Sequence, residues 1–368
     1  MTDYRADDYL YMQRALRLAE GATRRAAPNP GVGCVLVNNG RVVGEGATLA
    51  VGGDHAEIQA IKDCLARGES PRGATAYVTL EPCSHHGRTP PCAERLVAEG
   101  VARVVAAMVD PYHEVAGRGI AMLRAAGVEA SAGLMEAEAR WTHRGFLSRV
   151  ERGRPWVTLK AAATLDGKTA LLNGRSKWIT GPEARMDVQR LRAAHGAILT
   201  GSGTVLADDP QLTVRELQVA AQPWRVVLDG DLRTDAAARV YQGGGALLAS
   251  CETDEGRLAA FRERGVDVLA LARRGGKADL ADLLAQLAGR GVNELMVEAG
   301  AGLNGAMLRA GLVDEIVLYL APSLAGDAAR GLFVWPALAD LADKIELDIA
   351  DIGKVGRDLR LSLRPRRV

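Results

Sequence analysis

The sequence predicts an α/β protein with two domains. Short apolar segments alternate with segments whose apolar residues recur at helical spacing, a pattern typical of sheets covered by helices. The alternation closes near residue 135, gives way to an arginine-rich stretch at 136–154, and then resumes. The length of 368 residues also corresponds to about two typical domains. We therefore expect one domain at residues 1–148 and a second at 149–368.

The first half should begin with an amphipathic helix over about residues 7–24. A turn at 38–40, Asn-Asn-Gly, predicts a hairpin between short strands at 33–37 and 41–46. The later elements alternate between the two types: a helix from His55, a strand at 76–80, a helix from Cys92, a strand at 101–109, a helix at 120–126 and a strand from 128.

The second half repeats the alternation on a larger scale. Strands are expected at 156–162, 197–200, 225–228, 246–249, 266–270, 294–297 and 315–319, and helices at 182–194, at 280–287 and from Ala306. Residues 345–349 and 359–363 alternate strictly between apolar and polar side chains, which predicts an antiparallel edge of the sheet.

The composition argues against several classes of function. Lys and Arg number 46 against 45 Asp and Glu, and three Phe offer little stacking surface, so we expect no nucleic-acid partner. No apolar run of about 18 residues occurs, and the first residues do not resemble a signal peptide. Five cysteines, two of them in a metal pattern, indicate a reducing compartment. We therefore expect a cytoplasmic protein without a membrane partner.

The most informative motif combines His55 and Glu57 with Cys83 and Cys92. Imidazole and thiolate are zinc ligands, and three protein ligands leave one position for a water molecule whose pKa the ion lowers toward about 7. The Glu57 carboxylate could carry its proton to a leaving amine, as in zinc deaminases of nucleobase-like rings. His55 and Glu57 can converge only if a helix starts at His55, for which Asp54 is a plausible N-cap. Eight residues separate the two cysteines, however, where the general deaminase motif has two.

A second motif lies between the strand at 294–297 and the helix expected from Ala306. Gly300, Gly302 and Gly305 form a G-x-G-x-x-G pattern, which lets backbone N–H groups approach a pyrophosphate. No acidic residue ends the following strand, as a Rossmann domain would require. The motif therefore predicts phosphate binding outside a Rossmann fold.

Longer motifs resemble the bifunctional deaminase/reductase family of riboflavin biosynthesis. They comprise residues 28–37, 81–92, 165–170, 176–180 and 201–210, and so span nearly the whole chain. The resemblance implies a cytidine-deaminase-like three-layer α/β/α domain followed by a dihydrofolate-reductase-like α/β domain that uses NADPH. It also implies zinc bound by His55, Cys83 and Cys92, with Glu57 as the proton shuttle.

The same resemblance implies ligand contacts in the second domain. The cofactor would contact Ala162, Trp178, Thr204, Asp208, Gly300, Ala301, Gly302, Leu303, Asn304, Gly305 and Ala306. The phosphorylated substrate would contact Ser176, Arg192, Leu212, Arg215 and Glu298. The two arginines suit a phosphate because guanidinium groups bind it bidentately. No basic residue is evidently placed for the 2′-phosphate that distinguishes NADPH from NADH.

For three further residues the sequence allows either a functional role or a role in a turn. In the first domain, Asn29 could hydrogen-bond the pyrimidine edge and Arg88 could bind the substrate phosphate, or both could simply form turns. In the second, Asp166 could donate a proton, but its Leu-Asp-Gly context favours a turn.

We therefore expect an enzyme that catalyses two successive reactions. Zinc-dependent deamination of 2,5-diamino-6-(5-phosphoribosylamino)pyrimidin-4(3H)-one would precede NADPH-dependent reduction of the ribosyl group of 5-amino-6-(5-phosphoribosylamino)uracil to ribityl. One alternative is a nucleotide or tRNA deaminase fused to an unrelated reductase, which the near-neutral charge and the cysteine spacing disfavour. Another is a structural zinc module with a dinucleotide-sensing domain, although structural zinc normally has four protein ligands. We also expect a homo-oligomer.

Overall fold

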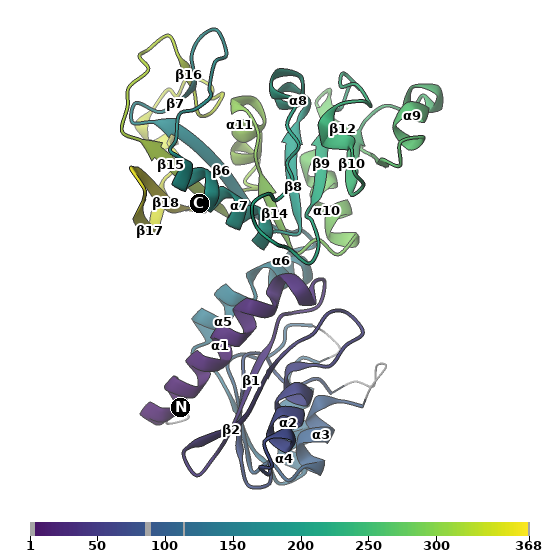
Figure 1. Ribbon diagram of the computed structural model, residues 1–368, viewed down its shortest axis with the longest axis vertical. Coiled ribbons are helices and arrows are strands. Elements are labelled where there is room, and N and C mark those ends of the chain that lie inside the picture. Colours follow the sequence, from purple (N-terminus) through teal and green to yellow (C-terminus); the bar gives the residue numbers. More distant parts are fainter. Residues whose placement is uncertain (1–3, 85–89, 113–114, 367–368) are drawn as a thin grey trace. The chain divides into compact units, whose positions relative to one another are not determined.

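The computed structural model describes residues 4–84, 90–112 and 115–366. The chain divides into two compact units, residues 1–153 and 154–368, and each combines a sheet with helices (Figure 1). Within the described ranges, no helix is long and apolar enough to cross a membrane.

The first unit is built on a five-stranded sheet with the order β2-β1-β3-β4-β5. β1 is antiparallel to its neighbours β2 and β3, while β3, β4 and β5 are parallel. The strands are β1 (Gly33–Asn38), β2 (Arg41–Ala47), β3 (Thr75–Val78), β4 (Arg103–Ala106) and β5 (Glu129–Ala132).

Helices cover both faces of this sheet. They are α1 (Ala6–Ala26), α2 (Ala56–Ala66), α3 (Cys92–Ala98), α4 (Arg118–Ala125), α5 (Glu136–Thr142) and α6 (Arg144–Arg152). α1 and α5 lie on one face and α2, α3 and α4 on the other, which confirms the three-layer prediction (Figure 1). α2 packs directly on β2, because Gly46 has no side chain to intervene: a Cβ there would lie 2.5 Å from the Ala60 nitrogen. This close packing fixes the start of α2 at one end of the sheet.

The second unit contains a nine-stranded sheet with the order β11-β10-β9-β8-β14-β6-β15-β18-β17. The strands from β11 to β15 are parallel, and the pairs β15/β18 and β17/β18 are antiparallel, as the alternating C-terminal segments predicted. The strands are β6 (Trp156–Thr164), β8 (Ala197–Gly201), β9 (Trp224–Leu228), β10 (Ala246–Ser250), β11 (Asp267–Ala270), β14 (Glu294–Val297), β15 (Glu315–Ala321), β17 (Leu347–Val355) and β18 (Asp358–Pro365).

Two apolar cores lie on opposite faces of this sheet. One contains residues of α10 (Leu280–Gly289) and α11 (Ala301–Arg309), and the other contains residues of α7 (Pro182–Ala194) and α9 (Glu255–Arg262). α8 (Ser202–Asp208) follows β8 directly. Two short ribbons, β7 (Lys168–Ala170) with β16 (Arg330–Gly331) and β12 (Arg273–Arg274) with β13 (Lys277–Ala278), complete the unit.

The glycine motif differs from its prediction. The helix expected from Ala306 begins five residues earlier, at Ala301, with Gly300 as its N-cap. Gly302 and Gly305 are therefore helical and do not form a loop. Gly305 serves packing, since a Cβ there would lie 2.3 Å from the Val334 carbonyl oxygen. The backbone N–H groups available to an anion are those of the first turn of α11.

Candidate functional site

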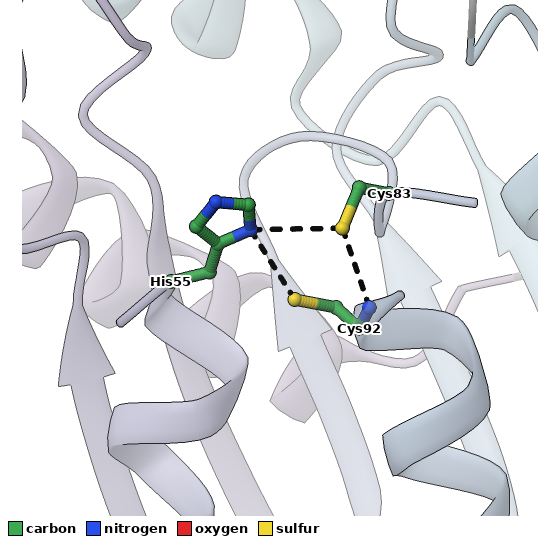
Figure 2. Close-up of side chains that lie close together, drawn as sticks. All are labelled: His55, Cys83 and Cys92. Carbon is green, nitrogen blue, oxygen red and sulfur yellow. Dashed lines mark hydrogen bonds between the residues drawn. The ribbon is translucent and has the colours of Figure 1, made fainter. Parts of the chain in front are cut away.

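The three predicted metal ligands come together in the first unit. His55 is the N-cap of α2, Cys83 follows β3, and Cys92 is the first residue of α3 (Figure 2). The N-cap prediction for Asp54 was wrong by one residue. Its carboxylate instead accepts hydrogen bonds from Gln59 and Lys62, at 2.6 and 2.5 Å, and so holds the segment before His55 against α2.

The geometry of the cluster fits a tetrahedral zinc ion. The Nδ1 atom of His55 lies 3.6 Å from the Cys83 sulfur and 3.4 Å from the Cys92 sulfur. The three ligand atoms all lie within 4.8 Å of one another. Bonds of about 2.0–2.1 Å to nitrogen and about 2.3 Å to sulfur, at the tetrahedral angle, would place the nitrogen and each sulfur about 3.6 Å apart. The protein thus offers one imidazole and two thiols at zinc-binding separations.

The electrostatics of the cluster favour a thiolate at Cys83. Hydrogen bonds from Cys92, whose backbone nitrogen lies 3.3 Å from the Cys83 sulfur, and from His55 lower the pKa of Cys83 well below that of a free thiol. The reciprocal hydrogen bond with Cys83 raises the pKa of His55 to about 9. A thiolate is the form that binds a metal ion.

Glu57 lies in the first turn of α2 and is only 3% exposed. Burial raises the pKa of Glu57 to about 7, and the negative charge at Cys83 adds to the shift. A carboxyl group with a pKa near neutrality can both accept and return a proton, which is what general acid–base catalysis requires.

A buried carboxylate that the sequence did not single out supports Cys83. Glu81 is 4% exposed, and its carboxylate accepts hydrogen bonds from three backbone N–H groups, those of Asp110, Gly117 and Ile120. It thereby ties the segment before Cys83 to the start of α4. A glutamate directly after an apolar strand was a visible signal for such a role.

The other two candidates of the first unit are Asn29 and Arg88. Asn29 is exposed in the loop between α1 and β1, where its backbone N–H donates to the Ala26 carbonyl. The neighbouring Pro28 carbonyl accepts a hydrogen bond from Arg149, at 2.8 Å. Arg88 lies outside the described residues.

The candidates of the second unit gather around one cavity of about 1280 Å³. It lies at the end of the sheet where β6, β8 and β14 meet the loops that follow them. Its lining includes all the predicted cofactor and substrate residues except Gly305: Ala162, Ser176, Trp178, Arg192, Thr204, Asp208, Leu212, Arg215, Glu298, Gly300, Ala301, Gly302, Leu303, Asn304 and Ala306.

Two of the predicted substrate residues bind each other. The Arg192 guanidinium donates to both Glu298 carboxylate oxygens, at 2.6 and 2.9 Å, and a third N–H group donates to the Thr213 carbonyl at 3.0 Å. Burial alone would raise the pKa of Glu298, but the charge of Arg192 lowers it. Arg192 therefore holds Glu298 ionised at the wall of the cavity.

Lys160 also lines the cavity, and sequence reasoning missed it. Burial lowers the pKa of Lys160, while the nearby Glu298 charge opposes that shift. The signal was present, because Lys160 is a charged residue in the middle of the apolar strand β6.

Trp178 lines the cavity, whereas Asp166 does not and serves the surrounding loops. Trp178 is 69% exposed, and the guanidinium of Arg185 lies 4.6 Å from its ring. The Asp166 carboxylate accepts hydrogen bonds from the Thr164 hydroxyl and from the N–H groups of Ala325 and Gly326. Asp166 thus joins two loops, in accord with its expected turn role.

Comparisons with known proteins bear on both units. Residues 155–361 match the RibD C-terminal domain family, and residues 5–108 match the cytidine and deoxycytidylate deaminase zinc-binding region. The riboflavin biosynthesis protein RibD of Escherichia coli (strain K12) is 48% identical over 369 residues, which cover 97% of this chain and 99% of that protein. A solved structure of Acinetobacter baumannii RibD, form 1, is 40% identical with a TM-score of 0.89, covering 98% of this chain and 99% of that one. The diaminohydroxyphosphoribosylaminopyrimidine deaminase/5-amino-6-(5-phosphoribosylamino)uracil reductase of Thermotoga maritima is 32% identical with a TM-score of 0.87, covering 98% and 99%.

Proposed function

Because this chain belongs to the family of RibD riboflavin biosynthesis proteins, we propose that each of its two units performs one of the two reactions of that family. The protein is a bifunctional deaminase and reductase of riboflavin biosynthesis. The first unit deaminates 2,5-diamino-6-(5-phosphoribosylamino)pyrimidin-4(3H)-one, and the second reduces the ribosyl group of the product to ribityl with NADPH. The observation that carries this conclusion is the separation of 3.4–3.6 Å between His55 and the two cysteine sulfurs, with a buried carboxylate two residues from His55.

In the first reaction, the protein supplies the metal ligands and the proton carrier. Zinc held by His55, Cys83 and Cys92 would polarise a water molecule and lower its pKa. Glu57 would take up a proton from that water and deliver it to the pyrimidine ring nitrogen. It would then take the proton of the hydroxyl group newly bound to the ring carbon and deliver it to the amino group, so that the C–N bond breaks and ammonia leaves. Asn29 and Arg88 are proposed to contact the pyrimidine edge and the substrate phosphate.

In the second reaction, the cavity holds the cofactor and the substrate together. Its volume of about 1280 Å³ exceeds the roughly 300–1,000 Å³ of a typical single-ligand site, which fits a dinucleotide beside a phosphorylated substrate. NADPH would supply a hydride to C1 of the opened ribosyl group. The N–H groups at the start of α11, after Gly300, face the cavity and suit the pyrophosphate.

The substrate side of the cavity is proposed to lie at Ser176, Leu212 and Arg215 and at the pair Arg192–Glu298. Besides binding the substrate phosphate, Arg192 would hold the Glu298 carboxylate in place in the cavity lining through its two hydrogen bonds. Lys160 lies beside that carboxylate and is a candidate to orient the ribosyl oxygens. Thr204 and Asp208, on α8, and Ala162 and Trp178 are proposed to contact the cofactor.

We also propose that the protein forms a homo-oligomer through its second unit. β17 is an edge strand, and its Ile349 and Ile352 are 65% and 58% exposed. A sheet edge with exposed apolar side chains favours association with another sheet. A second copy of the chain would cover these residues, and the molar mass measured by light scattering tests this: the mass of a single chain would contradict the proposal.

The central experiment measures the two reactions separately. Purified protein is given the diaminopyrimidine ribosyl phosphate with and without a zinc chelator, and ammonia is measured. The deaminated product is then supplied with NADPH under both conditions. We expect the chelator to abolish ammonia release and to leave NADPH oxidation unchanged, because the metal ligands all belong to the first unit. Ammonia release that survives complete removal of zinc would contradict the proposed role of the cluster.

A further inference from the structure

One end of the second unit's cavity carries an excess of basic side chains that the assignments above leave unused. Of the predicted substrate residues, Arg192 binds Glu298, which follows β14, and Lys160 on β6 lies near both. On the other side of β14 the sheet continues with β8, β9 and β10. If the pyrophosphate of a dinucleotide lay at the start of α11 and its nicotinamide faced the substrate residues, its adenosine half would extend past β8 toward the loop after β9. Arg233 is in that loop, and Lys277 is on the β12–β13 ribbon; both line the cavity.

The loop that carries Arg233 is held in one conformation by its buried neighbours. Asp229, fully buried, accepts a hydrogen bond from the Thr234 N–H group at 2.7 Å. The Thr234 hydroxyl is in turn 2.9 Å from the Tyr241 hydroxyl. Leu232 has a φ of 53°, so the chain turns sharply just before Arg233. This turn directs the exposed Arg233 to the start of α8, where its Nη2 donates to the Ser202 hydroxyl at 2.7 Å.

Asp231 also lines this end of the cavity, and its carboxylate interacts with both Arg273 and Arg233. Arg273 forms an ion pair with Asp231 at 2.8 Å and also donates to the Gly230 carbonyl. That contact holds the β12–β13 ribbon against the loop after β9. Within the described ranges, neither Arg233 nor Lys277 forms an ion pair. Two guanidinium groups thus share one carboxylate, and with Lys277 this end of the cavity keeps a net positive charge for an anion.

We propose that Arg233, assisted by Lys277, recognises the 2′-phosphate of NADPH and so selects NADPH over NADH. The inference rests on the proposed reductase function and adds the residues that choose the cofactor. A guanidinium binds a phosphate through paired hydrogen bonds, and arginine accommodates the 2′-phosphate in other NADP-binding sites. NADH lacks this phosphate and leaves Arg233 hydrated, so Arg233 adds affinity for one cofactor only.

The test uses two nucleotide fragments that differ only in this phosphate. Binding of adenosine 2′,5′-bisphosphate and of adenosine 5′-monophosphate to the full-length protein is measured by calorimetry. We expect Arg233→Ala to weaken the bisphosphate by about 10- to 100-fold, the usual effect of losing a hydrogen-bonded charge, and to leave the monophosphate unchanged. Lys277→Ala should have a smaller effect in the same direction. Arg264→Ala removes an equivalent exposed charge beyond α9, outside the cavity lining, and should bind both fragments like the unmodified protein.

Several outcomes would overturn the proposal. Equal weakening of both fragments by Arg233→Ala would show that Arg233 acts on the shared nucleotide or on the fold. Unchanged binding of the bisphosphate would place the phosphate elsewhere. If the unmodified protein reduces its substrate equally well with NADH and NADPH, the inference fails while the reductase function stands. If it binds neither fragment and oxidises neither cofactor, the reductase function fails with it.

Discussion

Replacing Arg192 with methionine tests whether the Arg192–Glu298 pair is primarily an internal support of the reductase cavity. Methionine keeps an unbranched chain of similar length but removes the guanidinium. Both side chains of the pair are only 10% exposed, so the Glu298 carboxylate would remain buried and lose its ion-pair partner. Removing one partner of a buried ion pair costs about 3–5 kcal/mol. Lys160 is close enough to Glu298 to offset part of this cost, so we expect a loss of about 2–3 kcal/mol.

The loss should be visible as a lower melting temperature of the second unit alone. For a unit of roughly 215 residues the unfolding entropy is about 0.45 kcal/mol/K, so the expected decrease is about 4–7 °C. Scanning calorimetry of the full-length protein measures it, and ammonia release by the first unit provides an internal control. Glu298→Gln should destabilise the unit more, because it leaves both Arg192 and Lys160 without their carboxylate.

The competing explanation is that Arg192 acts mainly on the substrate phosphate. In that case Arg192→Met would raise the KM for the deaminated substrate and leave the melting temperature where it was. The double variant Arg192→Met/Glu298→Gln further distinguishes the structural role of Arg192 from its role in substrate binding. If the residues stabilise each other, its loss of stability will be smaller than the sum of the two single losses.

Two other predictions concern the first unit. Glu57→Gln should still bind one zinc ion per chain, measured by atomic emission, but should release ammonia about 10²- to 10⁴-fold more slowly. Reduction of the deaminated substrate should continue at the normal rate. Loss of both activities together would contradict the independence of the two sites. Asp8 should make the unit less stable in acid, because hydrogen bonds from Arg103 and Tyr77 outweigh the effect of burial and lower the pKa of Asp8 to about 2, below the unfolded value of about 3.9. The stabilisation is then complete above about pH 4 and is lost as the pH falls toward 2. The difference in unfolding free energy between the unmodified protein and Asp8→Asn should therefore shrink by about 2 kcal/mol over that interval, a value already reduced for solvent screening of Arg103, whose side chain is 19% exposed. A difference that does not change with pH would refute this prediction.

The metal cluster was predictable from the sequence because its geometry depends on local structure. His55 and Cys92 each stand where a helix begins, and Cys83 stands just beyond a strand, so the pattern of apolar residues around them located all three. The identity of the ligands followed from their chemistry. The same local signals predicted the helix Pro182–Ala194 and the strand Glu294–Val297 to the residue.

The remaining features depend on contacts between distant segments, which no local pattern contains. The start of α11 was misplaced because glycines suggested a loop, whereas Gly305 is needed for the approach of Val334, 29 residues later in the chain. Arg192 was expected at a phosphate, and its partner Glu298 is 106 residues away. Arg233 was overlooked for the same reason. Only the order of strands in the sheet brings its loop to the cavity.

The hydrogen bonds of Glu81 have a consequence for when the metal is acquired. Three backbone N–H groups hold the segment before Cys83, and Cys92 and His55 stand at the ends of helices packed on a buried sheet. The positions of all three ligands thus depend on apolar packing and on a carboxylate outside the ligand set. In a zinc finger the ion itself drives folding, and chelators unfold the domain. We therefore expect this chain to fold before it binds zinc, so that a shortage of zinc would stop deamination while the protein stays folded.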